Sequence, residues 1–131
     1  NTNLDVQLKK DYLDQIPIQP HEDINTQFIT LSTAGDLSIK NGYAWDGPSG
    51  PTIDTKNFMR GSLVHDALYQ LMREGLLKTR THRKEADLIF KRICIEDGVS
   101  NLRASAYYKA LRKFGKPAAS PQNKKDIQRA P

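Results

Sequence analysis

Apolar and polar residues follow two different periods along this chain of 131 residues, and the change of period divides it into two parts. In roughly the first 26 residues neither period is sustained, and Pro17 and Pro20 interrupt any regular element. Two short runs with β-branched residues, 28–31 and 37–39, then flank the turn signal Ala34-Gly35-Asp36. This pattern predicts a β-hairpin.

From about residue 55 onward the apolar positions recur every three to four residues, which is the period of an amphipathic α-helix. The pattern predicts three helices, over about 55–74, 84–96 and 101–114, with a basic loop at 78–84. Gly75 and Gly98 are expected to end the first two helices. The third helix is expected to pack through Leu102, Ala106, Ala110, Leu111 and Phe114.

A segment dense in glycine and proline, residues 42–52, separates the hairpin from the helices. Its composition excludes the interior of a helix or a strand, and such loops can aim backbone groups at a ligand. The sequence therefore predicts an α+β fold in one small domain over residues 1–114. This domain consists of an N-terminal β-hairpin, the glycine-rich loop and three helices. The Pro-containing basic tail, 115–131, is expected to be disordered.

Composition and charge restrict the function further. The chain is 37% hydrophobic and 27% charged, as is usual for globular proteins, and it has no apolar run near the ~20 residues of a membrane span. Residues 112–131 carry six basic residues against one acidic residue, whereas the other 111 residues carry 14 of each. Because nucleic-acid proteins usually build their positive face into the fold, a nucleic-acid partner is not expected. The basic tail suits anionic lipid head groups, and equally a solvated chain end.

Chemistry is concentrated on two of the predicted helices. His65 and Tyr69 lie one helical turn apart and share a face. Asp66 is poorly placed to orient the neighbouring imidazole, but it can reach a cation held by a nearby loop. Asp87 lies at the edge of the apolar stripe of the next helix, and an antiparallel helix pair would bring it to His65 and Tyr69. The alternative to a catalytic site is a buried polar network that holds the two helices in register.

This division of roles suits metal-assisted ester hydrolysis. A neutral imidazole can take a proton from water, and a carboxylate on its far nitrogen fixes the tautomer. A hard cation such as Ca²⁺ would stabilise the developing oxyanion, with oxygen ligands from the glycine-rich loop and an aspartate. The backbone N–H of Gly47 is a candidate oxyanion donor. Asp46 is either a further cation ligand or a cap for the amides of the loop.

The order of a glycine-rich loop, a His-Asp-x-x-Tyr helix and an Ala-Asp-x-x-Phe helix resembles the active-site plan of phospholipase A2. It is most similar to the disulfide-free lipase domain of parvovirus capsids. This resemblance implies that His65 is the general base, Asp66 a Ca²⁺ ligand and Asp87 the carboxylate that orients the histidine. It also implies that Tyr69 donates a hydrogen bond to Asp87. Further Ca²⁺ ligands implied by the resemblance are the backbone carbonyls of Trp45, Gly47 and Ser49.

Residues 28–95 also resemble a phage and prophage family, domain of unknown function 1353. That family has a Gly-Phe/Tyr-x-x-Asp-Gly-x-Ser-x-Pro loop followed by His-Asp-x-Leu-Tyr, which match residues 42–51 and 65–69 here. The resemblance implies a phage origin, and with it a location in the virion or in the host cytoplasm.

Three functions therefore stand as alternatives for this chain. The first is a Ca²⁺-dependent, phospholipase A2-like hydrolase that acts at a phospholipid membrane surface. The second is a non-catalytic phage structural or accessory protein, which binds a virion protein through the glycine-rich loop and the basic tail. The third is a different metal-assisted hydrolase that acts on cell-wall material and uses Asp46 as a ligand.

Overall fold

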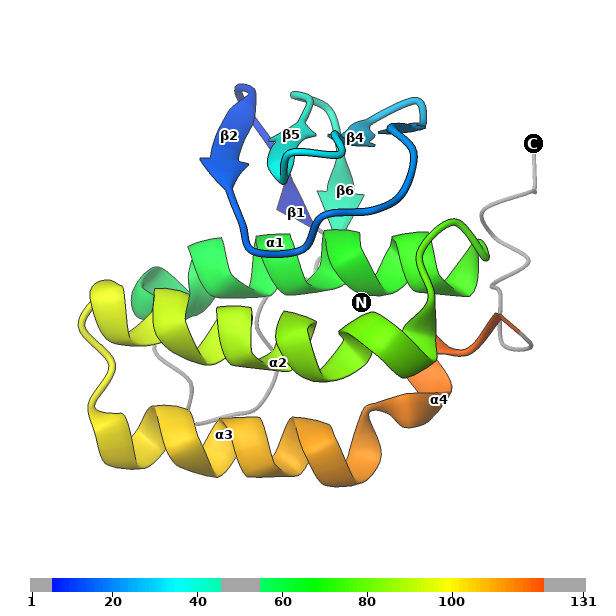
Figure 1. The fold of residues 1–131 in the computed structure, drawn as a ribbon. Coiled ribbons are helices and arrows are strands. Elements are labelled where there is room, and N and C mark those ends of the chain that lie inside the picture. The colour runs from blue at the N-terminus through cyan, green and yellow to red at the C-terminus, as the bar shows by residue number, and fades with distance from the viewer. Residues whose placement is uncertain (1–5, 46–54, 122–131) are drawn as a thin grey trace.

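The strands lie on one side of the first helix, and the other long helices lie on its opposite side (Figure 1). This arrangement comes from a computed structural model, which describes residues 6–45 and 55–121. The strands are β1 (Val6–Gln7), β2 (Tyr12–Gln15), β3 (Ile24–Asn25), β4 (Ile29–Leu31), β5 (Asp36–Ile39) and β6 (Ala44–Trp45). The helices are α1 (Thr55–Arg73), α2 (Thr79–Glu96), α3 (Asn101–Phe114) and α4 (Lys116–Ala119). The predicted α+β class is confirmed.

The strands form a four-stranded antiparallel sheet in the order β2-β5-β4-β3 and a two-stranded sheet of β1 and β6. The predicted hairpin is present as β4 and β5, with Ile29 opposite Ile39 and Gly35 at a φ of 90° in the turn. The expectation that the N-terminal segment has no regular element was wrong, because β1, β2 and β3 lie in it. These strands are only two to four residues long, which is too short for an alternating pattern to be recognised.

Helix α1 lies between the sheet layer and α2, so its apolar residues are buried on two sides (Figure 1). The two helices approach closely at Gly61, where an added Cβ would lie 2.9 Å from the Sγ of Cys94 and 3.3 Å from the ring of Phe90. Burial raises the pKa of the Cys94 thiol to about 12, as expected for a structural rather than a reactive cysteine. This close contact fixes α2 against α1 and so positions the side chains between them.

The basic segment before α2 is not a loop, as the sequence suggested, because α2 begins at Thr79. Lys78, the N-cap residue, makes no side-chain capping hydrogen bond, so the start of this helix lacks the usual sequence signal. The earlier start brings Arg83 onto the buried face of α2, together with Ala86 and Asp87.

The outer face of α3 is exposed, although the sequence suggested that it packs into the core. Leu102 is 83% exposed and Phe114 is 70% exposed, and Ala106 and Ala110 are exposed as well. The helix packs instead through Ala104, Tyr107 and Leu111. Both faces carry apolar residues, and the inner one is fixed by the edge contact between Tyr107 and Phe58, with ring centroids 5.1 Å apart.

The expected disordered tail is wrong for its first residues. Helix α4 follows α3 directly, and Ala119 within it is fully buried. Two side chains hold this turn to the helical layer. Arg73 donates to the carbonyl of Ala118 at 2.9 Å, and the hydroxyl of Thr79 donates to the carbonyl of Ala119 at 2.9 Å. Residues 122–131 of the predicted tail lie outside the described part of the chain.

Candidate functional site

Three side chains from α1 and α2 meet at one carboxylate oxygen. The Nε2 of His65 lies 2.8 Å from the Oδ1 of Asp87, and the hydroxyl of Tyr69 donates to the same oxygen at 2.6 Å. His65 and Tyr69 are one turn apart on α1, with ring centroids 4.1 Å apart. The predicted convergence of these residues across a helix pair is therefore present.

Asp87 is the centre of this network and is fully buried. Its second oxygen, Oδ2, accepts a hydrogen bond of 2.7 Å from the Nη1 of Arg112, and the Nη1 of Arg83 lies 3.7 Å from it. Burial by itself raises the pKa of Asp87. The hydrogen bonds from His65, Tyr69 and Arg112 outweigh burial and lower this pKa below its ordinary value, so the carboxylate is ionised.

The ionised carboxylate determines which nitrogen of His65 carries the proton. A carboxylate only accepts hydrogen bonds, so Nε2 of the neutral ring is the donor and Nδ1 holds the lone pair. Among the residues that the structure describes, none makes a hydrogen bond to Nδ1. The side chain of His65 is 9% exposed, so the ring is nearly but not completely enclosed. Nδ1 is thus the atom of this network that can accept a proton from water.

Tyr69 is a permanent donor in this network. Burial and the neighbouring Asp87 carboxylate raise the pKa of its hydroxyl above the ordinary value. The hydroxyl also accepts a hydrogen bond of 3.3 Å from Arg83. It therefore links the cation of α2 to the carboxylate, and it fixes the position of Oδ1 against His65.

Sequence reasoning missed two arginines and a glycine of this site. Arg83 was placed in a basic loop, and Arg112 was counted with the charges of the tail, yet both lie at Asp87. At Gly115 an added Cβ would lie 2.9 Å from the hydroxyl of Tyr69. The spacing of Arg83 and Asp87, four residues apart on one helix, was the one available signal. Nothing in the sequence indicated that the end of α3 reaches the site.

The predicted cation ligands fall only partly within the described residues. Asp66 lies half-buried on α1. Trp45 ends β6, and its indole Nε1 donates at 3.1 Å to the hydroxyl of Ser62, one turn before Asp66. The glycine-rich loop therefore begins beside the helix that carries Asp66. The remaining predicted ligands, Asp46, Gly47 and Ser49, lie outside the described residues.

Side chains alone do not form a metal centre in the part of the chain that the structure describes. No group of three or more His, Cys, Asp or Glu residues in 6–45 and 55–121 is arranged to hold a metal ion. No helix in the same ranges is long and apolar enough to cross a membrane. The predicted Ca²⁺ site depends mainly on backbone carbonyls of the loop, so its ligands are of a different kind.

Fold and site together define a small α+β domain with a histidine, a tyrosine and two arginines gathered around one buried aspartate. The model of the family described as protein of unknown function (DUF1353) matches residues 24–111, which is 88 of the 131 residues. The chain belongs to this family. The match includes His65, Tyr69, Arg83 and Asp87. No curated protein and no solved structure was found to match the chain.

Proposed function

We propose that this protein is a phage-derived, phospholipase A2-like ester hydrolase in which His65 activates a water molecule. The observation that supports this role is the shared hydrogen bonding of Asp87, which engages Nε2 of His65 and leaves Nδ1 as the acceptor. A general base needs a lone pair within reach of water and a fixed ring orientation. The buried carboxylate of Asp87 fixes the ring orientation and leaves the lone pair on Nδ1, which supports the proposed role.

In the proposed reaction, Nδ1 of His65 takes a proton from water while the water oxygen bonds to the ester carbonyl carbon. The imidazolium that forms donates through Nε2 to ionised Asp87, which stabilises the positive charge. When the tetrahedral intermediate breaks, the bond to the leaving alkoxide oxygen opens. That oxygen then receives the proton from Nδ1. The ring returns to its neutral form, and the products are a carboxylic acid and an alcohol.

Calcium is the cation that this proposal assigns to the site. The donors would be the Asp66 carboxylate, with Asp46, and the backbone carbonyls of Trp45, Gly47 and Ser49. An all-oxygen set of carboxylates and carbonyls fits Ca²⁺, which prefers such ligands. The hydrogen bond from Trp45 to Ser62 supports this assignment, because it holds the start of the loop beside the helix of Asp66. The bound ion would supply positive charge for the oxyanion of the intermediate.

The direct test is release of fatty acid from mixed phospholipid vesicles, measured with Ca²⁺ and with a chelator. We expect His65→Ala to lower the rate by about 10²–10⁴-fold, the usual contribution of a general base. The matched control is His82→Ala, because His82 lies on α2 and pairs with Glu85 at 2.8 Å instead of Asp87. Full activity of His65→Ala, or no release from any lipid class, would contradict the proposal.

The outer face of α3 favours a second candidate, a non-catalytic phage structural or accessory protein. This helix has no acidic residue, and the basic residues Arg103, Lys109 and Lys113 are exposed, as is Leu102. Such a face fits an acidic surface of a partner protein. The two candidates differ in their response to Ca²⁺. Binding of Ca²⁺ to the folded state raises the melting temperature if the first is correct and leaves it unchanged if the second is correct.

A further inference from the structure

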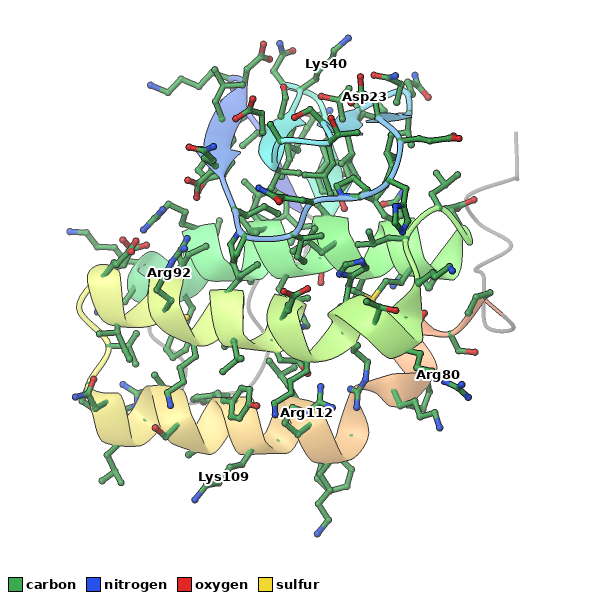
Figure 2. The ribbon with its side chains drawn as sticks, viewed as in Figure 1. Asp23, Lys40, Arg80, Arg92, Lys109 and Arg112 are labelled. Carbon is green, nitrogen blue, oxygen red and sulfur yellow. The ribbon has the colours of Figure 1, made fainter. Side chains whose placement is uncertain are left out.

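We propose that the C-terminal end of α3 is part of the site, and that Arg112 is a positioning residue that holds Asp87 in register with His65. The inference rests on the proposed function and adds an element to it. Figure 2 shows Arg112 directed from α3 toward α2, whereas Lys109 projects away from the helical layer. On α3, Arg112 therefore points into the helical layer, whereas Lys109 faces solvent.

Both carboxylate oxygens of Asp87 accept hydrogen bonds from side chains. Its Oδ1 accepts from His65 and Tyr69, and its Oδ2 accepts at 2.7 Å from Arg112. The carboxylate is fully buried, and its hydrogen bonds come from these protein donors. A guanidinium on Oδ2 and two donors on Oδ1 fix the plane of the carboxylate. That plane determines where the Nε2 of His65 points.

The C-terminal end of α3 is also held beside Asp87 by hydrogen bonds from Arg83. Nη1 of Arg83 donates to the carbonyl of Leu111 at 3.0 Å, and its Nη2 donates to the carbonyl of Arg112 at 3.2 Å. The carbonyl of Leu111 also accepts the backbone N–H of Gly115. Carbonyls in the last turn of a helix carry partial negative charge, so a cation there is favourable. Arg83 therefore caps α3 while lying beside Asp87, and it sets the distance from which Arg112 reaches the carboxylate.

The backbone at Gly115 leaves no room for a side chain. An added Cβ would lie 2.6 Å from the carbonyl oxygen of Leu111 and 2.9 Å from the hydroxyl of Tyr69. The φ of this residue is −82°, so glycine is needed here for lack of space and not for backbone conformation. The chain leaving α3 thus passes directly over the tyrosine that donates to Asp87.

These contacts predict what the loss of Arg112 does. Among the residues that the structure describes, four groups face Asp87: His65 and Tyr69 from α1, Arg83 from α2 and Arg112 from α3. Without Arg112, burial favours the protonated carboxyl, which can donate a hydrogen bond and no longer fixes the tautomer of His65. The variant then loses activity first on the acid side of its pH profile.

The experiment compares Arg112→Gln and Arg112→Lys with the matched control Lys109→Gln. We expect Arg112→Gln to lower kcat/KM on phospholipid vesicles by about 10–100-fold, the usual effect of removing a group that orients a ligand or base. The acid limb should move to higher pH. Arg112→Lys should recover part of the rate because it keeps the charge, and Lys109→Gln should match the wild-type protein.

A second readout is independent of hydrolysis. NMR titration of the Asp87 carboxyl and the His65 nitrogens in the folded proteins should show a higher Asp87 pKa in Arg112→Gln, and a mixture of His65 tautomers. Unchanged spectra would overturn the role of Arg112, whether or not lipid is hydrolysed. Absence of hydrolysis in the wild-type protein, together with changed spectra, would overturn the proposed function alone. If Arg112→Gln does not fold, the same spectra of Arg112→Lys test the role of Arg112.

Discussion

Two ionic networks lie toward opposite ends of the α1–α2 pair, and they are built in opposite ways. In one, a carboxylate, Asp87, is surrounded by two guanidinium groups, a tyrosine and a histidine. In the other, the guanidinium of Arg60 on α1 lies among three carboxylates. These carboxylates belong to Asp14, Glu96 and Asp97, at 3.7, 2.6 and 3.1 Å.

The closest distances in the two networks are nearly equal, so distance does not explain how they differ. The two networks differ in how far the group at their centre is exposed to water. Asp87 is fully buried, whereas the side chain of Arg60 is 32% exposed and Glu96 is 49% exposed. Water screens the second network and can replace any partner that is lost. In the first network the central carboxylate is fully buried, although Arg112 is itself 32% exposed. The comparison therefore predicts larger effects for changes at Asp87 than for changes at Arg60.

The largest expected effect is that of Asp87→Ala on stability. The variant leaves the guanidinium groups of Arg83, which is 11% exposed, and Arg112, which is 32% exposed, without their counter-charge. Breaking a buried ion pair in this way costs about 3–5 kcal/mol. Urea denaturation measures the loss. The matched control is Asp97→Ala, which removes a carboxylate of the exposed network and should cost about 1 kcal/mol or less. Equal losses in the two variants would show that burial does not separate the networks.

The next effect concerns two tyrosines in corresponding roles. Tyr69 donates to buried Asp87 at 2.6 Å, and Tyr12 donates to half-buried Asp14 at 2.8 Å. Tyr69→Phe removes a hydrogen bond to a buried charge and should cost about 1.5–3 kcal/mol. Tyr12→Phe should cost less, because water can take the place of its hydroxyl. The midpoints of urea unfolding test this order, and a larger loss for Tyr12→Phe would reverse the comparison.

Low pH should reduce the stabilisation that ionised Asp87 contributes to the folded protein. The pKa of Asp87 is lower in the folded protein than in the unfolded chain, so the folded state binds fewer protons. Its stabilisation is complete above the unfolded value of about 3.9 and is lost as the pH falls through the folded value. The difference in unfolding free energy between wild type and Asp87→Asn should therefore shrink on acidification below about pH 4. A difference that stays constant to pH 2 would contradict this.

The sequence was sufficient to predict those parts of the fold and site that depend on local spacing. Helices α1 and α3 follow from their periodicity, and Gly75 lies just beyond the end of α1 as predicted. The pairing of His65 and Tyr69 follows from one turn of helix. Asp87 could also be assigned to the site, because an antiparallel second helix places its buried stripe, which Asp87 borders, against α1.

The features that could not be predicted from the sequence depend on contacts between distant segments. Strand β2 pairs with β5, and β1 with β6, across long stretches of chain that no local pattern reports. Helix α3 has two apolar faces, and the inner one packs against Phe58, Phe90 and Cys94 from the other helices. Arg112 reaches Asp87 because that face packs inward, so its role could not be read from spacing. A count of charges assigned it to the tail, although its partner lies 25 residues earlier.

The smallest effect is expected for Arg60→Gln, which tests the exposed network from its centre. Arg60 lies next to the C-terminal end of α2, where Glu96 and Asp97 oppose the helix dipole, and Arg92 also pairs with Glu96 at 3.4 Å. Because its partners are solvated, the loss should stay near the upper end of the usual 0.2–1 kcal/mol, about 1 kcal/mol. Added salt should reduce it further, since exposed pairs are screened. The loss in Asp87→Ala should persist in the same salt, because no ions enter the buried network. A loss for Arg60→Gln that exceeds about 2 kcal/mol and resists salt would mean that this network, too, is effectively buried.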